Sequence, residues 1–172
     1  MPEVFRTRDV IVFKKGDAHA VTVSSSLVGA GWPGGQGVQW FNTGRDELAV
    51  TTSDGLPHGF LLWGSDETPD QFTSMTRSQP AYQYAVLGFG GWVIATKTFE
   101  RFTLASRLSP PNVPIVYQAQ DKILFSLRGL FTKEDEWTLS GDPRAPNGNI
   151  IGVVIRPPSV LTDGYLTLQL RI

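Results

Sequence analysis

The sequence predicts an all-β protein, an antiparallel β-sandwich or barrel with long loops and at most one or two short helices. Three observations support this fold class. Gly and Pro account for 18 and 12 of the 172 residues, so the chain has many turns. Lys and Glu, the commonest exposed helix formers, are scarce. The apolar stretches are short and are bounded by turn residues, at the spacing of a sandwich or barrel.

These apolar stretches are the expected strands. In chain order they are Val10–Phe13, Val21–Val23, Val38–Phe41, Leu48–Thr52, Phe60–Trp63, Tyr82–Leu87, Trp92–Thr96, Phe99–Leu104, Ile115–Ala119, Ile123–Leu127, Trp137–Leu139, Ile150–Ile155 and Tyr165–Ile172. One helix is expected between Thr68 and Arg77, where Thr-Pro-Asp provides an N-cap residue, a proline and an acid in the first turn.

Two strand patterns carry different expectations. Residues Leu166–Ile172 alternate strictly between apolar and polar, which predicts one buried and one wet face. Residues Ile150–Ile155 are apolar on both faces. Such a run indicates either a central strand covered on both sides or a strand whose outer face meets a partner subunit.

The domain organisation is expected to be simple. Residues 1–8 carry two arginines and little periodicity, so they are interpreted as an N-terminal arm that is disordered or ordered only on a partner. Residues 9–172 are expected to form a single β domain. The stiff, proline-rich connector at 109–114 is the candidate boundary if there are two subdomains.

Composition excludes several function classes. Lys+Arg is 15 and Asp+Glu is 16, a net charge of −1, so the chain lacks the positive field of a general nucleic-acid binder. There is no cysteine, and therefore no disulfide, zinc-thiolate site or cysteine nucleophile. The N-terminus lacks the apolar core of a signal peptide, and no run approaches the length of a membrane span.

The search for catalytic or metal-binding motifs yields only weak patterns. His19 and His58 are far apart, and neither has neighbouring ligands at metal-site spacing. The acidic clusters at 66–70 and 134–136 lack calcium-loop spacing and fit solvated turns better. No Gly-x-Ser-x-Gly elbow is present. We therefore expect no enzyme activity, no cofactor and no metal.

The five tryptophans suit either a core or a binding surface. For most of them core packing is the simpler interpretation. Trp32 is the exception, because it lies in the glycine-rich stretch Gly29–Gly37, interpreted as a flexible loop that displays one large aromatic side chain. Together with Arg6 and Arg8 of the arm, Trp32 is predicted to make contacts outside the domain, since these residue types dominate interface energies.

The second half of the chain contains a recognisable order of segments. Residues Gly141–Pro158, with Ile-Gly-Val-Val and a Pro-Pro turn, lead towards the alternating strand of Asp163–Leu170. This resembles the ending of tailed-phage capsid decoration, or head cement, proteins. Tyr84–Thr96, with its Gly-Gly-Trp, resembles their preceding hairpin. The likeness covers roughly the last 90 residues, and it carries over no functional residue because the family has no invariant active site.

The resemblance implies an all-β virion protein without a cofactor, assembled in the host cytoplasm onto the capsid surface. Its partner would be the major capsid protein, and its own state a homotrimer that bridges neighbouring capsid subunits. One alternative is a carbohydrate-binding or receptor-binding β-sandwich module that uses exposed tryptophans. Another is a β-barrel enzyme with scattered catalytic residues. Sugar binding or turnover by the isolated protein would separate these from the first hypothesis.

Overall fold

The structure, a computed structural model, describes residues 1–16, 19–23, 32–41, 47–50, 59–64, 82–87, 90–102, 114–126, 129–133 and 146–171. The all-β prediction is confirmed: strands are the main secondary structure of the described part, which contains no helix of seven residues or more. The helix expected near Thr68–Arg77 and the strand expected at Trp137–Leu139 lie outside the described residues.

One half of the fold is a seven-stranded sheet in which every neighbouring pair is antiparallel. In spatial order its strands are β1 (Phe5–Arg6), β2 (Val10–Lys14), β8 (Val93–Thr96), β12 (Leu166–Leu170), β11 (Pro146–Arg156), β9 (Lys122–Ser126) and β10 (Phe131–Lys133). In this sheet three neighbouring pairs join strands that are consecutive in the chain: β1–β2, β9–β10 and β11–β12.

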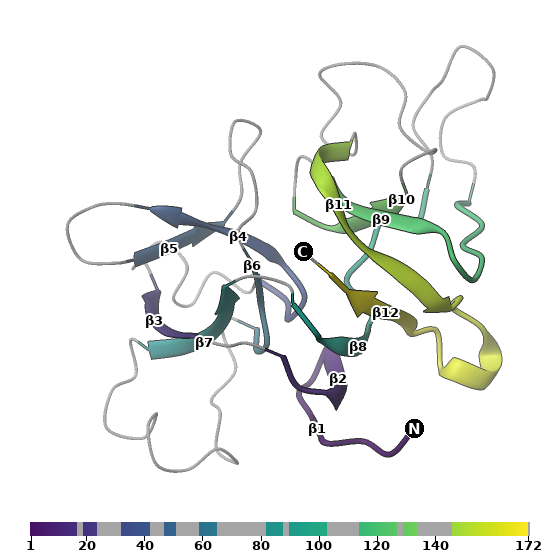
Figure 1. The fold of residues 1–172 in the computed structure, drawn as a ribbon, viewed down its shortest axis with the longest axis horizontal. Coiled ribbons are helices and arrows are strands. Elements are labelled where there is room, and N and C mark those ends of the chain that lie inside the picture. The colour runs from purple at the N-terminus through teal and green to yellow at the C-terminus, as the bar shows by residue number, and fades with distance from the viewer. Residues whose placement is uncertain are drawn as a thin grey trace.

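The other half is a closed five-stranded barrel. Its order is β3 (His19–Val23), β5 (Glu47–Val50), β4 (Gly37–Phe41), β6 (Gly59–Leu61) and β7 (Tyr82–Leu87), which returns to β3. The β3–β5 pair is parallel and the other pairs are antiparallel. The protein therefore combines a barrel with an open sheet (Figure 1).

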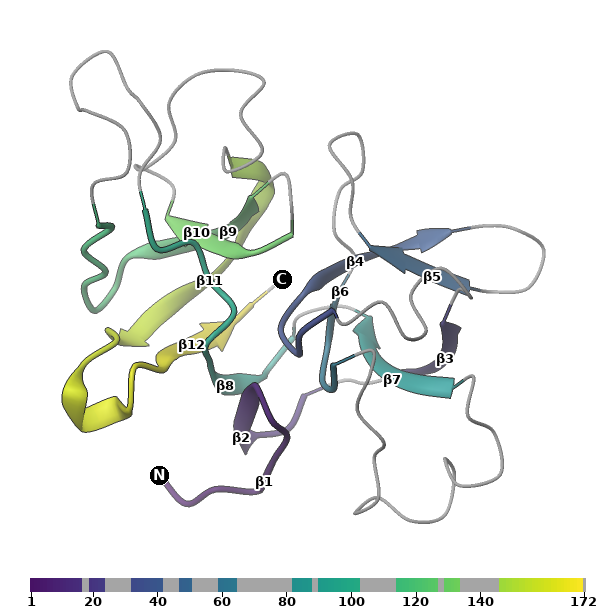
Figure 2. The same cartoon turned by 180° about the vertical axis from the view of Figure 1, so that it is seen from behind.

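The barrel is an insertion between two neighbouring strands of the sheet. The chain leaves the sheet after β2, builds β3 to β7 and returns as β8, which pairs directly with β2. The two crossing points touch, because Gly16 packs against the Gly90 carbonyl and the Trp92 indole so closely that a Cβ atom would overlap both. Figures 1 and 2 show the barrel strands on one side, the sheet on the other, and β6 between them.

Both halves share one hydrophobic core. The inward side chains of the sheet pack together with Phe60, Leu62 and Trp63, which come from β6 and the residues after it. The Phe60 ring meets the Trp92 ring edge-on at a centroid distance of 5.9 Å and the Phe131 ring at 6.3 Å. Since Phe60 belongs to the barrel and Trp92 leads into the sheet, the two parts cannot separate without exposing this aromatic cluster.

The alternation of the last strand is confirmed. Leu166, Leu168 and Leu170 are fully buried in the core. On the opposite face Arg171 is exposed and Gln169 is half-buried, as expected, but Thr167 is only 4% exposed. The prediction that this face is wet is therefore wrong at Thr167. Ile172 lies outside the described residues.

Two expected strands are wrong or incomplete. Residues 115–118 form no strand, and the segment ends in a turn where Gln120 has a φ of 75°. Of the stretch that begins at Phe99, the described residues make only isolated bridges, Phe99 with Phe131 and Phe102 with Pro114. The sequence pattern also missed β1 and β10, each of only two or three residues.

The N-terminal segment differs from the expected free arm. Phe5–Arg6 forms β1 and pairs with β2. The Phe5 ring stacks on Trp63 at 6.3 Å and packs against the core. Strand pairing and one aromatic side chain therefore anchor this segment, although its sequence has no extended apolar periodicity. Of the connector at 109–114, only Pro114 is described.

Candidate binding surface

The turn between β11 and β12 is the most exposed apolar feature of the described residues. Its sequence, Pro157 to Gly164, contains the short 3₁₀ helix η3 (Val160–Thr162). The Ser159 amide donates to Thr162 Oγ1 at 2.8 Å, and the amides of Thr162 and Gly164 donate to the Ser159 carbonyl at 3.2 and 2.9 Å. These bonds fix the turn at both ends, so its outward side chains are held in place.

The two side chains at the tip of this turn are aliphatic. Val160 is 94% exposed and Leu161 is 97% exposed. Neither contributes to the core, and a scattered single exposed apolar residue would call for no explanation. Two adjacent ones on a rigid turn form an apolar tip, which we define as Val160 and Leu161.

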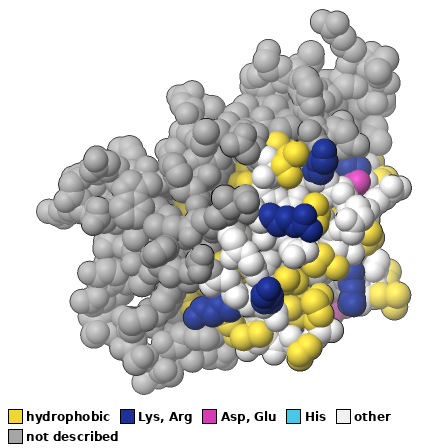
Figure 3. All heavy atoms as spheres, viewed as in Figure 1, with side chains coloured by type: hydrophobic (Ala, Val, Ile, Leu, Met, Phe, Trp, Pro, Cys, Tyr) yellow, Lys and Arg dark blue, Asp and Glu magenta, His cyan; other side chains and the backbone are white. Residues whose placement is uncertain are grey.

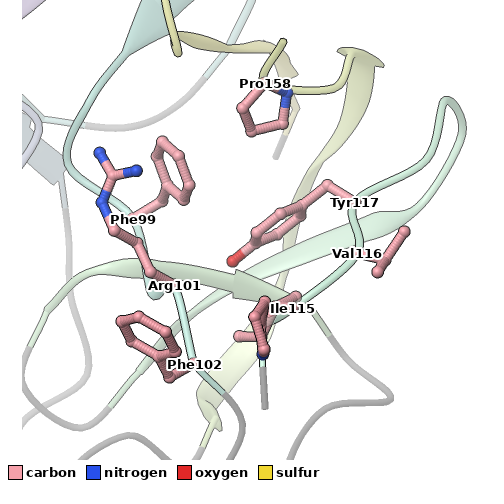
Figure 4. Close-up of a pocket in the computed structure, with 8 residues that line it drawn as sticks. Phe99, Arg101, Phe102, Ile115, Val116, Tyr117 and Pro158 are labelled. Atoms are coloured by element: carbon pink, nitrogen blue, oxygen red, sulfur yellow. The ribbon is translucent and has the colours of Figure 1, made fainter. Parts of the chain in front are cut away.

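A hollow lies at the base of the same turn. It has a volume of about 440 Å³ and is lined by Phe99, Arg101, Phe102, Pro114, Ile115, Val116, Tyr117 and Pro158. Pro158 belongs to the turn, so the hollow and the apolar tip are parts of one surface. Figure 4 shows Pro158 on one side of the hollow, opposite Phe102 and Ile115.

Aromatic side chains form the wall of the hollow. The Phe99 and Tyr117 rings meet edge to face, with centroids 5.5 Å apart and planes at 85°. The Arg101 guanidinium lies 4.5 Å from the centre of the Phe99 ring, a cation–π contact. Two further apolar side chains remain open to water: Phe102 is 48% exposed and Val116 is 65% exposed.

Buried polar contacts hold this wall in place. The Tyr117 hydroxyl donates to the Glu100 carbonyl at 2.7 Å, and the Ser126 hydroxyl donates to the Glu100 carboxylate at 2.8 Å. Lys133 pairs with Asp121 at 3.0 Å and also donates to the Val116 carbonyl. Since these groups are buried or half-buried and bonded, the hollow is preorganised.

This arrangement suits binding. Apolar and aromatic walls with a single cation at the rim accept aliphatic, aromatic or proline side chains of a partner protein. The described residues that line the hollow supply no nucleophile paired with a base, because the Tyr117 hydroxyl is engaged by the Glu100 carbonyl.

The structure places the predicted arginines at the sheet margin near the barrel. Arg6, in β1, is exposed and donates two hydrogen bonds to the Glu3 carboxylate, both at 2.8 Å. This hydrogen-bonded contact lowers the pKa of Glu3 and raises the pKa of Arg6 relative to their ordinary values. Arg8 is exposed as well and pairs with Asp9 at 3.1 Å. Ion pairs therefore hold both arginines in place, and neither lies on a free arm.

Trp32 is half-buried, and the residues after it are packed. The Gly34 amide donates to the Asp9 carboxylate at 3.2 Å, so the Trp32 segment and the Arg8 segment meet at Asp9. Residues 34–37 are buried, which differs from the flexible loop expected there, while residues 29–31 lie outside the described part. Trp63 and Trp92 are core residues, as expected for most tryptophans.

Sequence reasoning missed the apolar tip and the hollow. The available signal for the tip was an aliphatic pair, Val-Leu, set between Pro-Pro-Ser and Thr-Asp-Gly, where turn residues predict exposure. The hollow had no signal, because it joins residues 99–102, residues 114–117 and Pro158 through the fold alone.

Comparisons of the chain with protein-family models, with curated proteins and with solved structures find no match. Over the described ranges, no three His, Cys, Asp or Glu side chains gather as metal ligands would. No helix in the same ranges has the length and apolar character to cross a membrane.

Proposed function

We propose that this chain is a structural virion protein that binds the outside of a tailed-phage capsid and bridges neighbouring capsid subunits as a homotrimer. It would be assembled in the host cytoplasm with the major capsid protein as its partner. The observation that carries the proposal is the apolar tip, two aliphatic side chains held almost fully in water by a hydrogen-bonded turn.

Two further observations support it. The tip lies within the segment whose sequence resembles the ending of capsid decoration proteins, between the Ile-Gly-Val-Val strand and the alternating terminal strand. The hollow beside it offers a second apolar contact, so one face of the molecule can both insert into a partner and receive a side chain from it. Arg6, Arg8 and Trp32 are additional candidate contacts to capsid or neighbouring subunit.

The carbohydrate-binding alternative needs exposed indoles. Of the tryptophans with described side chains, Trp63 and Trp92 are buried and Trp32 is half-buried. The described surface therefore favours a protein partner over a sugar.

The test measures loading of the purified protein onto expanded capsids of its own phage. Burial of one aliphatic side chain contributes about 1.5–3 kcal/mol, so the double variant Val160→Ser/Leu161→Ser should bind at least about 100-fold more weakly. The matched control is Ile150→Ser, a partly exposed aliphatic residue towards the other end of β11, which should load like the wild type.

Alanine at Arg6, Arg8 or Trp32 tests the additional contacts. Substitution is preferable to deletion of residues 1–8, because deletion would also remove β1 and the Phe5 anchor. A folded wild-type protein with no affinity for its own capsid would overturn the proposal. Normal loading of the Val160/Leu161 variant would instead remove the apolar tip as the docking element.

A further inference from the structure

Most of the exposed large hydrophobic side chains of the described part lie on one surface. There are seven such side chains, and four of them, Phe102, Val116, Val160 and Leu161, belong to the hollow or to the apolar tip. Figure 3 shows hydrophobic side chains at the margin of the molecule where the β11–β12 turn lies in Figure 1. Exposed apolar side chains that gather in this way mark a contact with another molecule.

The apolar tip lies close to the hollow but does not fill the hollow of its own molecule. Pro158 lines the hollow and Leu161 follows three residues later, so their Cα atoms are at most about 11 Å apart. The hydrogen bonds of the turn hold Val160 and Leu161 in water, where they are 94% and 97% exposed. A projecting tip beside an open hollow is a self-complementary surface, because a two-fold rotation places the tip of one copy over the hollow of the other.

The charges beside the tip and the hollow are complementary as well. Asp163 follows the tip and is exposed, and its carboxylate has no hydrogen bond or ion pair within the described residues. It acts only weakly on Arg6, which is already paired with Glu3. Arg101, which lines the hollow, is also exposed, and its guanidinium lies beside the Phe99 ring (Figure 4). None of the side chains that line the hollow is acidic, so Arg101 offers an unmatched positive charge to an incoming carboxylate.

We propose that the free protein pairs with a second copy of itself about a two-fold axis, each apolar tip entering the hollow of the other copy. In the pair, each Asp163 carboxylate lies beside the Arg101 guanidinium of the other copy. The inference goes beyond the proposed function, because it concerns the protein before it meets a capsid. The tip serves either its own copy or the capsid, so a pair has to open before its tips can dock.

A second copy fits the hollow better than a small molecule does. Phe102 and Val116 are 48% and 65% exposed, so the hollow is open to water, whereas small-molecule sites enclose most of their ligand. Each tip supplies only two side chains, far fewer than the roughly 20–30 residues a side of a stable interface. We therefore expect a weak and reversible pair.

The first experiment follows the mass of the full chain by sedimentation velocity, without capsids, from about 10 μM to 1 mM protein. We expect a monomer–dimer equilibrium. The double variant Val160→Ser/Leu161→Ser and the hollow variant Val116→Ser should each raise the dissociation constant at least tenfold. The matched control for the hollow is Val4→Ser, a valine that is 58% exposed and does not line it, which should pair like the wild type.

The second experiment exchanges the charges. Arg101→Glu and Asp163→Lys should each weaken pairing at least tenfold, because like charges then meet at both contacts. A mixture of the two variants should form a mixed dimer, since both of its contacts join opposite charges, and this rescue shows that each variant is folded. Arg171→Glu makes the same change in net charge at an exposed position outside the hollow and should leave pairing unchanged.

Four results would overturn the proposal: a monomer at all concentrations, a trimer in place of the dimer, normal pairing of the Val160/Leu161 variant, or no mixed dimer from the two charge variants. None of them decides the capsid proposal, which is measured by loading. A protein that pairs but does not load onto capsids would retain the paired state and lose the proposed function. A protein that loads but stays monomeric in solution would do the reverse.

Discussion

Two glycines of this protein, Gly35 and Gly164, have the same left-handed backbone conformation in different surroundings. Gly35 has a φ of 89°, a conformation that disfavours any side chain, and a Cβ atom there would lie 2.7 Å from Thr96 Oγ1 and 2.9 Å from Thr98 Cβ. Gly164, with a φ of 78°, has the same backbone demand but open space around it. The pair separates the cost of the backbone conformation from the cost of crowding.

Alanine substitution at these two glycines should therefore differ in effect. Gly164→Ala should lower the free energy of unfolding by about 1–2 kcal/mol, the cost of the left-handed conformation. Gly35→Ala should lose about 1–3 kcal/mol more, because two buried threonines must move. Urea denaturation measures both, with an unchanged slope as the check on two-state behaviour. Equal losses would show that the Gly35 site relaxes freely.

At the scale of elements, the β11–β12 hairpin has two roles in one stretch of chain. Its strands contribute Leu166, Leu168 and Leu170 to the core, whereas its turn exposes Val160 and Leu161 to water. The pleat constrains the register of the strand residues, because a slip of one residue would exchange the two faces of β12. The turn residues are under no such packing constraint.

Two leucine substitutions in this hairpin should show the contrast. Leu168→Ala should lower the free energy of unfolding by about 2–5 kcal/mol, since it opens a cavity in the core. Leu161→Ala should change it by no more than about 0.5 kcal/mol. Chemical denaturation of both variants provides the measurement. A large loss for Leu161→Ala would mean that the side chain stabilises the monomer, which argues against its use for docking.

Sequence reasoning succeeded where local pattern determines the outcome. Alternation in residues 166–170 predicted a strand and its buried face, and short apolar runs between turn residues predicted the all-β class. It failed where partners are distant in the chain. β10 contains Lys133, whose charge is matched by Asp121, and Ile115 to Tyr117 serve the hollow without forming a strand.

For the whole molecule, the inserted barrel and the sheet share a core, so they should unfold together. Phe60 of the barrel packs on Trp92 and Phe131, and residues 34–37 add ties such as the Gly37 amide to the Gly129 carbonyl at 2.7 Å. A chain with separable halves would instead bury little at the junction. The prediction of a single β domain over residues 9–172 likewise implies that the two parts unfold together.

Thermal and chemical unfolding should accordingly be one transition, with far-UV circular dichroism and tryptophan fluorescence changing together. Phe60→Ala should lower the stability of the entire protein by about 3–5 kcal/mol. Two transitions, or a Phe60→Ala effect confined to one of them, would show that barrel and sheet are independent units.

The two edge strands of the seven-stranded sheet, β10 and β1, affect how the protein aggregates at high concentration. At one margin the chain after β8 crosses over and covers β10, through the Phe99–Phe131 bridge and the Glu100 amide bonded to the Phe131 carbonyl at 2.8 Å. At the other, β1 is only two residues long and is bordered by the charged Glu3–Arg6 pair. Open strand edges are the templates for amyloid-like stacking, and short, charged or covered edges suppress it. This protein can therefore be crowded to high local concentration while its sheets stay discrete.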